Sequence, residues 1–145
     1  MVHIQQSALL PYSAERMFAL VNDIDAYPAY MRGCQGAEIL ERSEHSVLAR
    51  LELGKGGLRY ALTTRNLLQP PERMTMTLVD GPFNDFAAEW RFMALSATAC
   101  KTSLDLRFSF RAGLVDRALA ALFEATGRDL VQAVCKRAET QYGNT

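Results

Sequence analysis

The C-terminal part of the sequence carries the longest helical pattern in the chain. Apolar or small residues recur every three or four positions between Leu114 and Tyr142, which places them on one side of a helix. These positions are Val115, Leu119, Leu122, Thr126, Leu130, Val134 and Ala138. Charged residues occupy the other side, so the pattern predicts an amphipathic helix that packs on a core and does not span a membrane. At about 1.5 Å per residue the helix would be roughly 40 Å long and would need an apolar surface of similar length.

The region before this helix alternates between apolar and polar residues with a period of two, which predicts strands. The expected strands are 2–9, 37–44, 46–53, 58–68, 73–80, 86–95 and 99–111. Short turns join the last six, which favours antiparallel pairing with one apolar face. Gly54-Lys55-Gly56-Gly57 lacks the spacing of a phosphate-binding loop and is expected to be a hairpin turn. The segment 81–84 is expected to be a turn that exposes Phe83.

Two short helices are expected between the first strand and the rest of the sheet. Ser13 is typical of a helix N-cap, and Met17, Phe18 and Val21 give the helix after it a buried face. The predicted fold is therefore α+β, with a curved antiparallel sheet of about seven strands around the terminal helix. The short helices would close one end of the space between the sheet and the terminal helix.

Length and composition favour one domain that spans residues 1–145. Hydrophobic residues make up 49% of the chain, and 16 basic residues balance 16 acidic ones, so net charge gives no reason to expect DNA as a partner. The isolated cysteines Cys34, Cys100 and Cys135 fit a reducing compartment and no metal site. The first residues do not resemble a signal peptide, which favours a cytoplasmic location.

The sequence gives little support to an enzymatic activity. Only His3 and His45 are present, and both are expected at the surface. No nucleophile–histidine constellation or inward-facing carboxylate pair is evident. A binding protein without a required cofactor is favoured over an enzyme.

A curved sheet that grips one helix leaves room for a cavity. Small helix residues such as Ala121, Ala125 and Gly127 either enlarge this space or let the helix backbone approach the sheet closely. Methionine and aromatic side chains on the inward faces suit an irregular apolar ligand, but they also fill ordinary cores. Periodicity alone leaves both interpretations open.

Three segments resemble the coenzyme Q-binding family, a branch of the START-like polyketide cyclase/dehydrase superfamily. They are the run from Tyr12 to Pro28, the Gly81-Pro82-Phe83 segment with Trp90-Arg91-Phe92 after it, and the end of the terminal helix from Arg137 to Gly143. The similarity covers nearly the whole chain. After Pro28 the chain reads Ala29-Tyr30-Met31-Arg32-Gly33-Cys34, where the family commonly has an aromatic residue and then a proline-aromatic-cysteine run. This departure lies at the expected mouth of a tunnel.

The resemblance implies a helix-grip fold and a hydrophobic tunnel that holds a lipid quinone such as ubiquinone, in support of respiratory electron transfer. The residues expected to contact this ligand are Phe18, Tyr27, Tyr60, Leu62, Met74, Met76, Trp90, Phe92, Leu106, Phe108, Phe123, Thr126 and Leu130. Among these, Tyr60 or Thr126 is the expected hydrogen-bond donor to a quinone carbonyl. Transient contact with a membrane surface would accompany quinone exchange.

Two alternatives follow from the same resemblance. Bacterial toxin members of the family bind the large ribosomal subunit and block subunit joining, and other members of the superfamily are cyclases. Ribosome binding would need a basic surface, and six arginines fall on the predicted outer face of the sheet. They are Arg50, Arg59, Arg65, Arg91, Arg107 and Arg111. Because Glu52, Glu89 and Asp105 lie among them, a face of paired, solvated charges is the favoured interpretation of this pattern.

Overall fold

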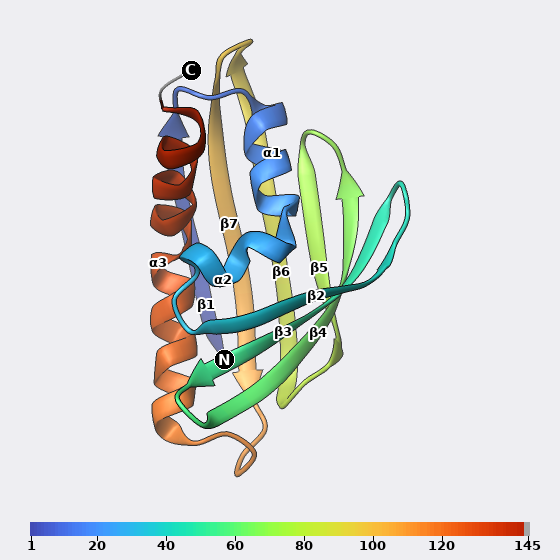
Figure 1. Cartoon of the computed structure of the whole chain (residues 1–145), viewed down its shortest axis with the longest axis vertical. Helices are drawn as coiled ribbons and strands as arrows, with labels where there is room; N and C mark the ends of the chain where they lie inside the picture. The colour runs from blue at the N-terminus through green and yellow to red at the C-terminus, as the bar shows by residue number, and fades with distance from the viewer. Residues whose placement is uncertain (144–145) are drawn as a thin grey trace.

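The computed structural model describes residues 1–143 and shows a single curved sheet gripping a long helix (Figure 1). The strands are β1 (Val2–Leu10), β2 (Cys34–Arg42), β3 (Ser46–Lys55), β4 (Leu58–Gln69), β5 (Arg73–Asp80), β6 (Phe83–Ser96) and β7 (Ala99–Phe110). The helices are α1 (Ala14–Asn22), α2 (Tyr27–Tyr30) and α3 (Arg117–Tyr142), with a 3-10 turn, η1 (Ile24–Ala26), before α2. This confirms the predicted α+β helix-grip architecture.

The seven strands follow the order β1-β7-β6-β5-β4-β3-β2, and every neighbouring pair is antiparallel. Consecutive strands are neighbours because short turns join them, and only β1 crosses over to pair with the last strand. In Figure 1, β1, β6 and β7 run along the long axis of the molecule, whereas β2, β3 and β4 cross it obliquely. The sheet thus bends around α3, and α1 and α2 lie over its concave side.

The terminal helix begins later than the sequence pattern predicts. It starts at Arg117 because the side chain of Asp116 caps it, accepting a hydrogen bond from the backbone N–H of Ala118 at 2.7 Å. Leu114 and Val115 therefore lie before the helix, and Val115 is not part of its buried stripe. The buried residues of α3 are Leu119, Thr126, Gly127, Val131, Val134 and Ala138. The pattern missed Gly127 and Val131 and included Leu122 and Leu130, which are only half-buried.

The prediction of an exposed turn at Phe83 is wrong. Only Gly81-Pro82 turns, with Gly81 at a φ of +152°, and Phe83 is already the first residue of β6. Its side chain is 1% exposed and stacks on Phe110 with ring centroids 4.5 Å apart. Gly81 and Pro82 therefore indicate the turn correctly. The turn ends before Phe83 because burial of the Phe83 side chain in the core is more favourable than its exposure.

The expected alternation of buried and exposed residues fails at two strand ends. Leu58 is 59% exposed because it is the first residue of β4, at the end of the β3–β4 hairpin, where it pairs with Lys55. Ala94 is exposed near a register shift between β6 and β7. In contrast, the alternation of Val47, Ala49 and Leu51 places all three side chains in the core, as predicted.

The middle of α3 approaches the sheet closely at Gly127. A Cβ atom at this position would lie 3.0 Å from both Ile4 Cδ1 on β1 and Leu106 Cδ2 on β7. Such a separation is shorter than ordinary van der Waals contact, so only glycine fits without displacement of its neighbours. Of the two interpretations of this residue, close approach is the correct one.

Candidate functional site: an apolar cavity beneath α3

A small apolar cavity lies between the concave face of the sheet and the helices. Its volume is about 60 Å³. Its walls come from α1, α2, the five strands β3 to β7 and α3, and they present almost only carbon and sulfur atoms. The lining residues are Val21, Tyr27, Tyr30, Met31, Leu51, Leu53, Leu62, Met76, Phe86, Ala88, Trp90, Leu104, Leu106, Phe123, Thr126, Gly127, Leu130 and Val134.

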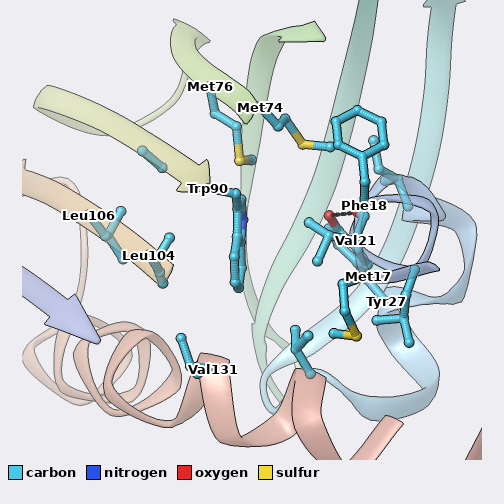
Figure 2. Packing of buried hydrophobic residues seen from close by; sticks show 14 of the residues in the cluster. Met17, Phe18, Val21, Tyr27, Met74, Met76, Trp90, Leu104, Leu106 and Val131 are labelled. Carbon is cyan, nitrogen blue, oxygen red and sulfur yellow. Dashed lines mark hydrogen bonds between the residues drawn. The ribbon is translucent and has the colours of Figure 1, made fainter. Parts of the chain in front are cut away.

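Trp90 stands at the centre of this region. Figure 2 shows its ring between Leu104 and Leu106 of β7 on one side and Val21 of α1 on the other, with Met76 beside it. Trp90 is 3% exposed, and its ring stacks on that of Phe92, with centroids 6.2 Å apart. Because Trp90 is the chain's single tryptophan and lines the cavity, its fluorescence would report directly on anything that enters.

The structure brings most of the predicted ligand-contacting residues to this cavity. Those on its wall are Tyr27, Leu62, Met76, Trp90, Leu106, Phe123, Thr126 and Leu130. The five that do not line it are Phe18, Tyr60, Met74, Phe92 and Phe108. Phe18 packs edge-on against Phe92 at 5.7 Å, and Met74 is fully buried, so these residues support the wall from behind.

Neither predicted hydrogen-bond donor points freely into the cavity. The Thr126 hydroxyl lies 2.8 Å from the carbonyl oxygen of Arg32 and 2.9 Å from that of Leu122, so its single proton is already used within the protein. Tyr60 belongs instead to a separate recess of about 10 Å³ near Leu122. Burial raises the pKa of the Tyr60 phenol above its ordinary value, which keeps it neutral.

Sequence reasoning missed Tyr30 and Met31, the two side chains that α2 and the residue after it place at the cavity wall. The Tyr30 hydroxyl is buried and has no hydrogen-bond partner among residues 1–143. Burial raises the pKa of this phenol, while the nearby Arg137 lowers it to a smaller extent. The concentration of large side chains in Tyr27-Pro28-Ala29-Tyr30-Met31 was the available signal.

The arginines on the outer face of the sheet are mostly paired with acids. Arg59 contacts Glu52 at 3.2 Å and Arg107 contacts Asp105 at 3.6 Å. Arg91 and Arg73 both reach Glu89, and Arg65 lies 3.8 Å from Glu41. The His3 ring pairs with Asp105 on this face, which confirms its position at the surface. His45 is exposed in the turn between β2 and β3. This face is therefore a network of exposed ion pairs, with little net positive charge.

A second group of basic residues lies at one end of the long axis. Lys55 ends β3 next to the β3–β4 turn, and Arg111 and Arg117 flank the loop between β7 and α3. Both segments lie at the lower end in Figure 1. All three side chains are exposed, and within the described part of the chain none forms an ion pair. The exposed Leu58 and Leu114 lie in the same two segments. We call these five residues the basic end.

The sequence comparison identifies the family to which this architecture corresponds. Residues 10–135 match the family model described as polyketide cyclase / dehydrase and lipid transport. The chain belongs to this family. The predicted START-like membership is thereby confirmed, and the match includes every element that lines the cavity from α1 to the middle of α3.

Two relatives of this family member carry names of different kinds. The Ribosome association toxin RatA of Pseudomonas aeruginosa is 43% identical over 97% of this chain and 98% of its own length. The Coenzyme Q-binding protein COQ10 homolog B, mitochondrial, of Xenopus laevis is 25% identical, and the match covers 98% of this chain and 60% of that protein. The names thus point to a ribosome-associated toxin and to a quinone-binding protein.

Solved structures confirm the fold of the family. The Zhui aromatase/cyclase from Streptomyces sp. R1128 matches with a TM-score of 0.80 at 21% identity, over 95% of this chain and 93% of that one. A START superfamily protein from Mycobacterium smegmatis matches with a TM-score of 0.76 at 21% identity, over 96% and 98%. At this identity the likeness shows the shared fold and not a shared reaction.

The relatives' names are those of non-enzymes, although the family also includes cyclases. Within residues 1–143 no group of His, Cys, Asp or Glu is arranged to hold a metal ion. None of the described helices has the length and apolarity needed to cross a bilayer. Cys34, Cys100 and Cys135 form no disulfide bond.

Proposed function

We propose that this protein associates with the ribosome, through the large subunit, and interferes with subunit joining. The observation that carries the proposal is the 43% identity over nearly the full length of both chains to a protein named Ribosome association toxin RatA. Identity on this scale, without truncation of either chain, favours a shared surface as well as a shared fold.

The basic end is the surface best suited to ribosomal RNA. A cation that already contacts a carboxylate must give up that contact before it binds a phosphate, so paired arginines contribute little. Lys55, Arg111 and Arg117 have no such competitor among the described residues. The proposed contact therefore lies at the end of the molecule and not on the outer face of the sheet.

Co-sedimentation with purified large subunits over a range of salt concentrations tests this proposal. The triple variant Lys55→Glu, Arg111→Glu and Arg117→Glu is expected to associate more weakly. The slope of the logarithm of the association constant against the logarithm of salt concentration should fall in magnitude by about 3, because each lost phosphate contact removes about 0.9 from it. In cells, overexpression of the unmodified chain should increase free subunits at the expense of joined ribosomes, and the triple variant should not.

A matched control reverses three arginines on the outer sheet face, Arg50→Glu, Arg65→Glu and Arg91→Glu. The change in net charge is identical, so a smaller effect on association would assign binding to the basic end. If the control weakens association as much as the test variant, the interaction is a non-specific response to net charge. If the unmodified protein does not sediment with large subunits even at low salt, ribosome association is refuted.

We propose, as a second function, that the cavity beneath α3 binds an isoprenoid lipid, with ubiquinone the candidate. The apolar wall around Trp90 supports this proposal, and so does the relative named Coenzyme Q-binding protein. A cavity of about 60 Å³ is much smaller than the roughly 300–1,000 Å³ of ordinary ligand sites. Lipid entry therefore requires side chains or α2 to move, and burial of the isoprenoid chain at about 25 cal/mol per Å² supplies the free energy.

Titration with ubiquinone while Trp90 fluorescence is followed tests the second function, together with mass spectrometry of lipid extracted from the purified protein. Ala88 lines the cavity, so Ala88→Val is expected to fill it and to reduce quinone binding at least several-fold. Ala87 is exposed on the same strand, and Ala87→Val should leave binding unchanged. Unchanged fluorescence and no extracted quinone would refute quinone binding by this chain.

A further inference from the structure

A groove on the surface lies directly over the cavity, between α2 and α3. Its volume is about 570 Å³, within the range of small-molecule sites. One wall is the segment from Ala29 to Arg32, and the other is the face of α3 that carries residues three or four positions apart. These α3 residues are Thr126, Asp129, Leu130, Gln132, Ala133, Lys136, Arg137 and Thr140.

Only one layer of side chains separates this groove from the cavity. Tyr30, Met31, Thr126 and Leu130 line both spaces. Each of these residues therefore faces the surface groove on one side and the apolar interior on the other. A movement of Tyr30 and Met31 would join the two spaces without any change in the sheet.

The groove carries positive charge. Arg32, Lys136 and Arg137 stand against one carboxylate, Asp129, which gives a net charge of +2. Arg32 lies 3.7 Å from Asp129, an exposed ion pair of small energetic value. Lys136 has no ion-pair partner within residues 1–143. The guanidinium of Arg137 lies 5.5 Å from the centre of the Tyr30 ring, so the cation and the separating side chain are in contact.

The wall formed by α2 and the two residues after it has few links to α3. Helix α2 has only four residues, and its N-cap, Ala26, offers no side-chain hydrogen bond. At the groove, Tyr30 of α2 contacts Arg137 of α3. Arg32, two residues after α2, pairs with Asp129, and its carbonyl oxygen accepts a hydrogen bond from Thr126. The Tyr30 hydroxyl is buried and has no hydrogen-bond partner among residues 1–143, which costs free energy that an incoming oxygen acceptor would remove.

We propose that the α2–α3 groove is the mouth of the cavity and the binding site for an anionic headgroup. The ligand class is therefore an amphiphile with a carboxylate or phosphate head and an apolar chain. The headgroup binds Lys136 and Arg137, and the chain passes between Tyr30, Met31 and Leu130 towards Trp90. This inference rests on the proposal above that the cavity binds a lipid, and it changes the expected head, since ubiquinone has an uncharged head and the groove favours an anionic one. Ribosomal RNA fits less well, because a recessed groove joined to an apolar cavity matches an amphiphile and not a phosphate backbone.

The test compares two probes that differ only in the head, dodecyl phosphate and dodecanol, at concentrations below micelle formation, with inorganic phosphate as a third probe. Calorimetry measures affinity, and Trp90 fluorescence reports entry of the chain. Dodecyl phosphate is expected to bind at least tenfold more tightly than dodecanol, since two charge-assisted hydrogen bonds are gained. Inorganic phosphate should bind much more weakly than dodecyl phosphate and leave Trp90 fluorescence unchanged.

The variant Lys136→Gln with Arg137→Gln should reduce the preference for dodecyl phosphate to about twofold while dodecanol binding persists. Arg42→Gln with Arg50→Gln, which removes equal charge from exposed side chains of β2 and β3, should leave the preference intact. Equal affinity for both dodecyl probes, or a preference that survives loss of Lys136 and Arg137, overturns the headgroup assignment but leaves lipid binding standing. Inorganic phosphate binding as tightly as dodecyl phosphate overturns the link to the cavity.

Two further results separate this inference from the functions proposed above. If neither dodecyl probe nor ubiquinone binds or alters Trp90 fluorescence, the lipid-binding function itself fails, and the inference fails with it. If the Lys136 and Arg137 variant loses ribosome association but keeps the preference for dodecyl phosphate, the groove is an RNA contact and the inference is overturned.

Discussion

Replacing Phe83 by alanine is expected to lower the free energy of unfolding by about 3–5 kcal/mol, the largest effect of any single substitution considered for this protein. Phe83 is 1% exposed and is surrounded by aromatic rings. Its ring centroid lies 4.5 Å from that of Phe110 and 5.4 Å from those of Phe86 and Phe123. Truncation removes these contacts and leaves a cavity that the rigid sheet cannot close.

Urea unfolding followed by circular dichroism measures this effect, and the thermal midpoint should fall by roughly 10 °C. Met93 lies on the same strand and is 55% exposed, so Met93→Ala should change stability by no more than about 0.5 kcal/mol. A Phe83→Ala variant as stable as Met93→Ala would show that the ring does not belong to the core.

Replacing Gly127 by leucine is expected to destabilise the protein by about 1–3 kcal/mol and to abolish ligand binding in the cavity. A Cβ atom there already lies 3.0 Å from Ile4 Cδ1 and Leu106 Cδ2, so the remaining carbons have no space unless α3 moves away from β1 and β7. The gain of roughly 1 kcal/mol in helix propensity over glycine offsets only part of this cost.

Ala121→Leu provides the control, because Ala121 is exposed on the same helix and leucine there should be nearly neutral. Stability is measured by urea unfolding, and ligand binding by Trp90 fluorescence with the dodecyl probes. A Gly127→Leu protein that is as stable as the parent would mean that the helix does not press against the sheet at this position.

Much of the fold could be predicted because its signals are local. The alternation of Val47, Ala49 and Leu51 depends only on which face of a strand each residue occupies. Ser13 caps α1 because its side-chain oxygen accepts a hydrogen bond from the backbone N–H of Arg16, three residues away. Element ends were less accurate. Asp116 caps α3 and Phe83 begins β6 because each makes contacts that an alternation of apolar and polar residues does not encode.

The candidate site was predicted in part. Tyr27, Trp90 and Leu130 reach the cavity wall as expected because strand and helix faces determine which way they point. Phe92 and Met74 face the same interior but stop short of the cavity, since depth along the core is not visible in periodicity. Tyr30 and Met31 were missed because α2 is too short to show a periodic pattern.

The sequence by itself determined the order of elements and the apolar side of each, because these depend on residues close together in the chain. It also determined the similarity to a family of lipid-transport and cyclase proteins, which depends on the chain as a whole. Only the tertiary structure decided how much space remains under α3 and which cations stay unpaired. Both depend on residues distant in sequence, such as Arg32 beside Thr126 and Asp129, or Arg65 of β4 beside Glu41 of β2. Packing and charge pairing are properties of three-dimensional neighbours, and the folded chain is what makes these residues neighbours.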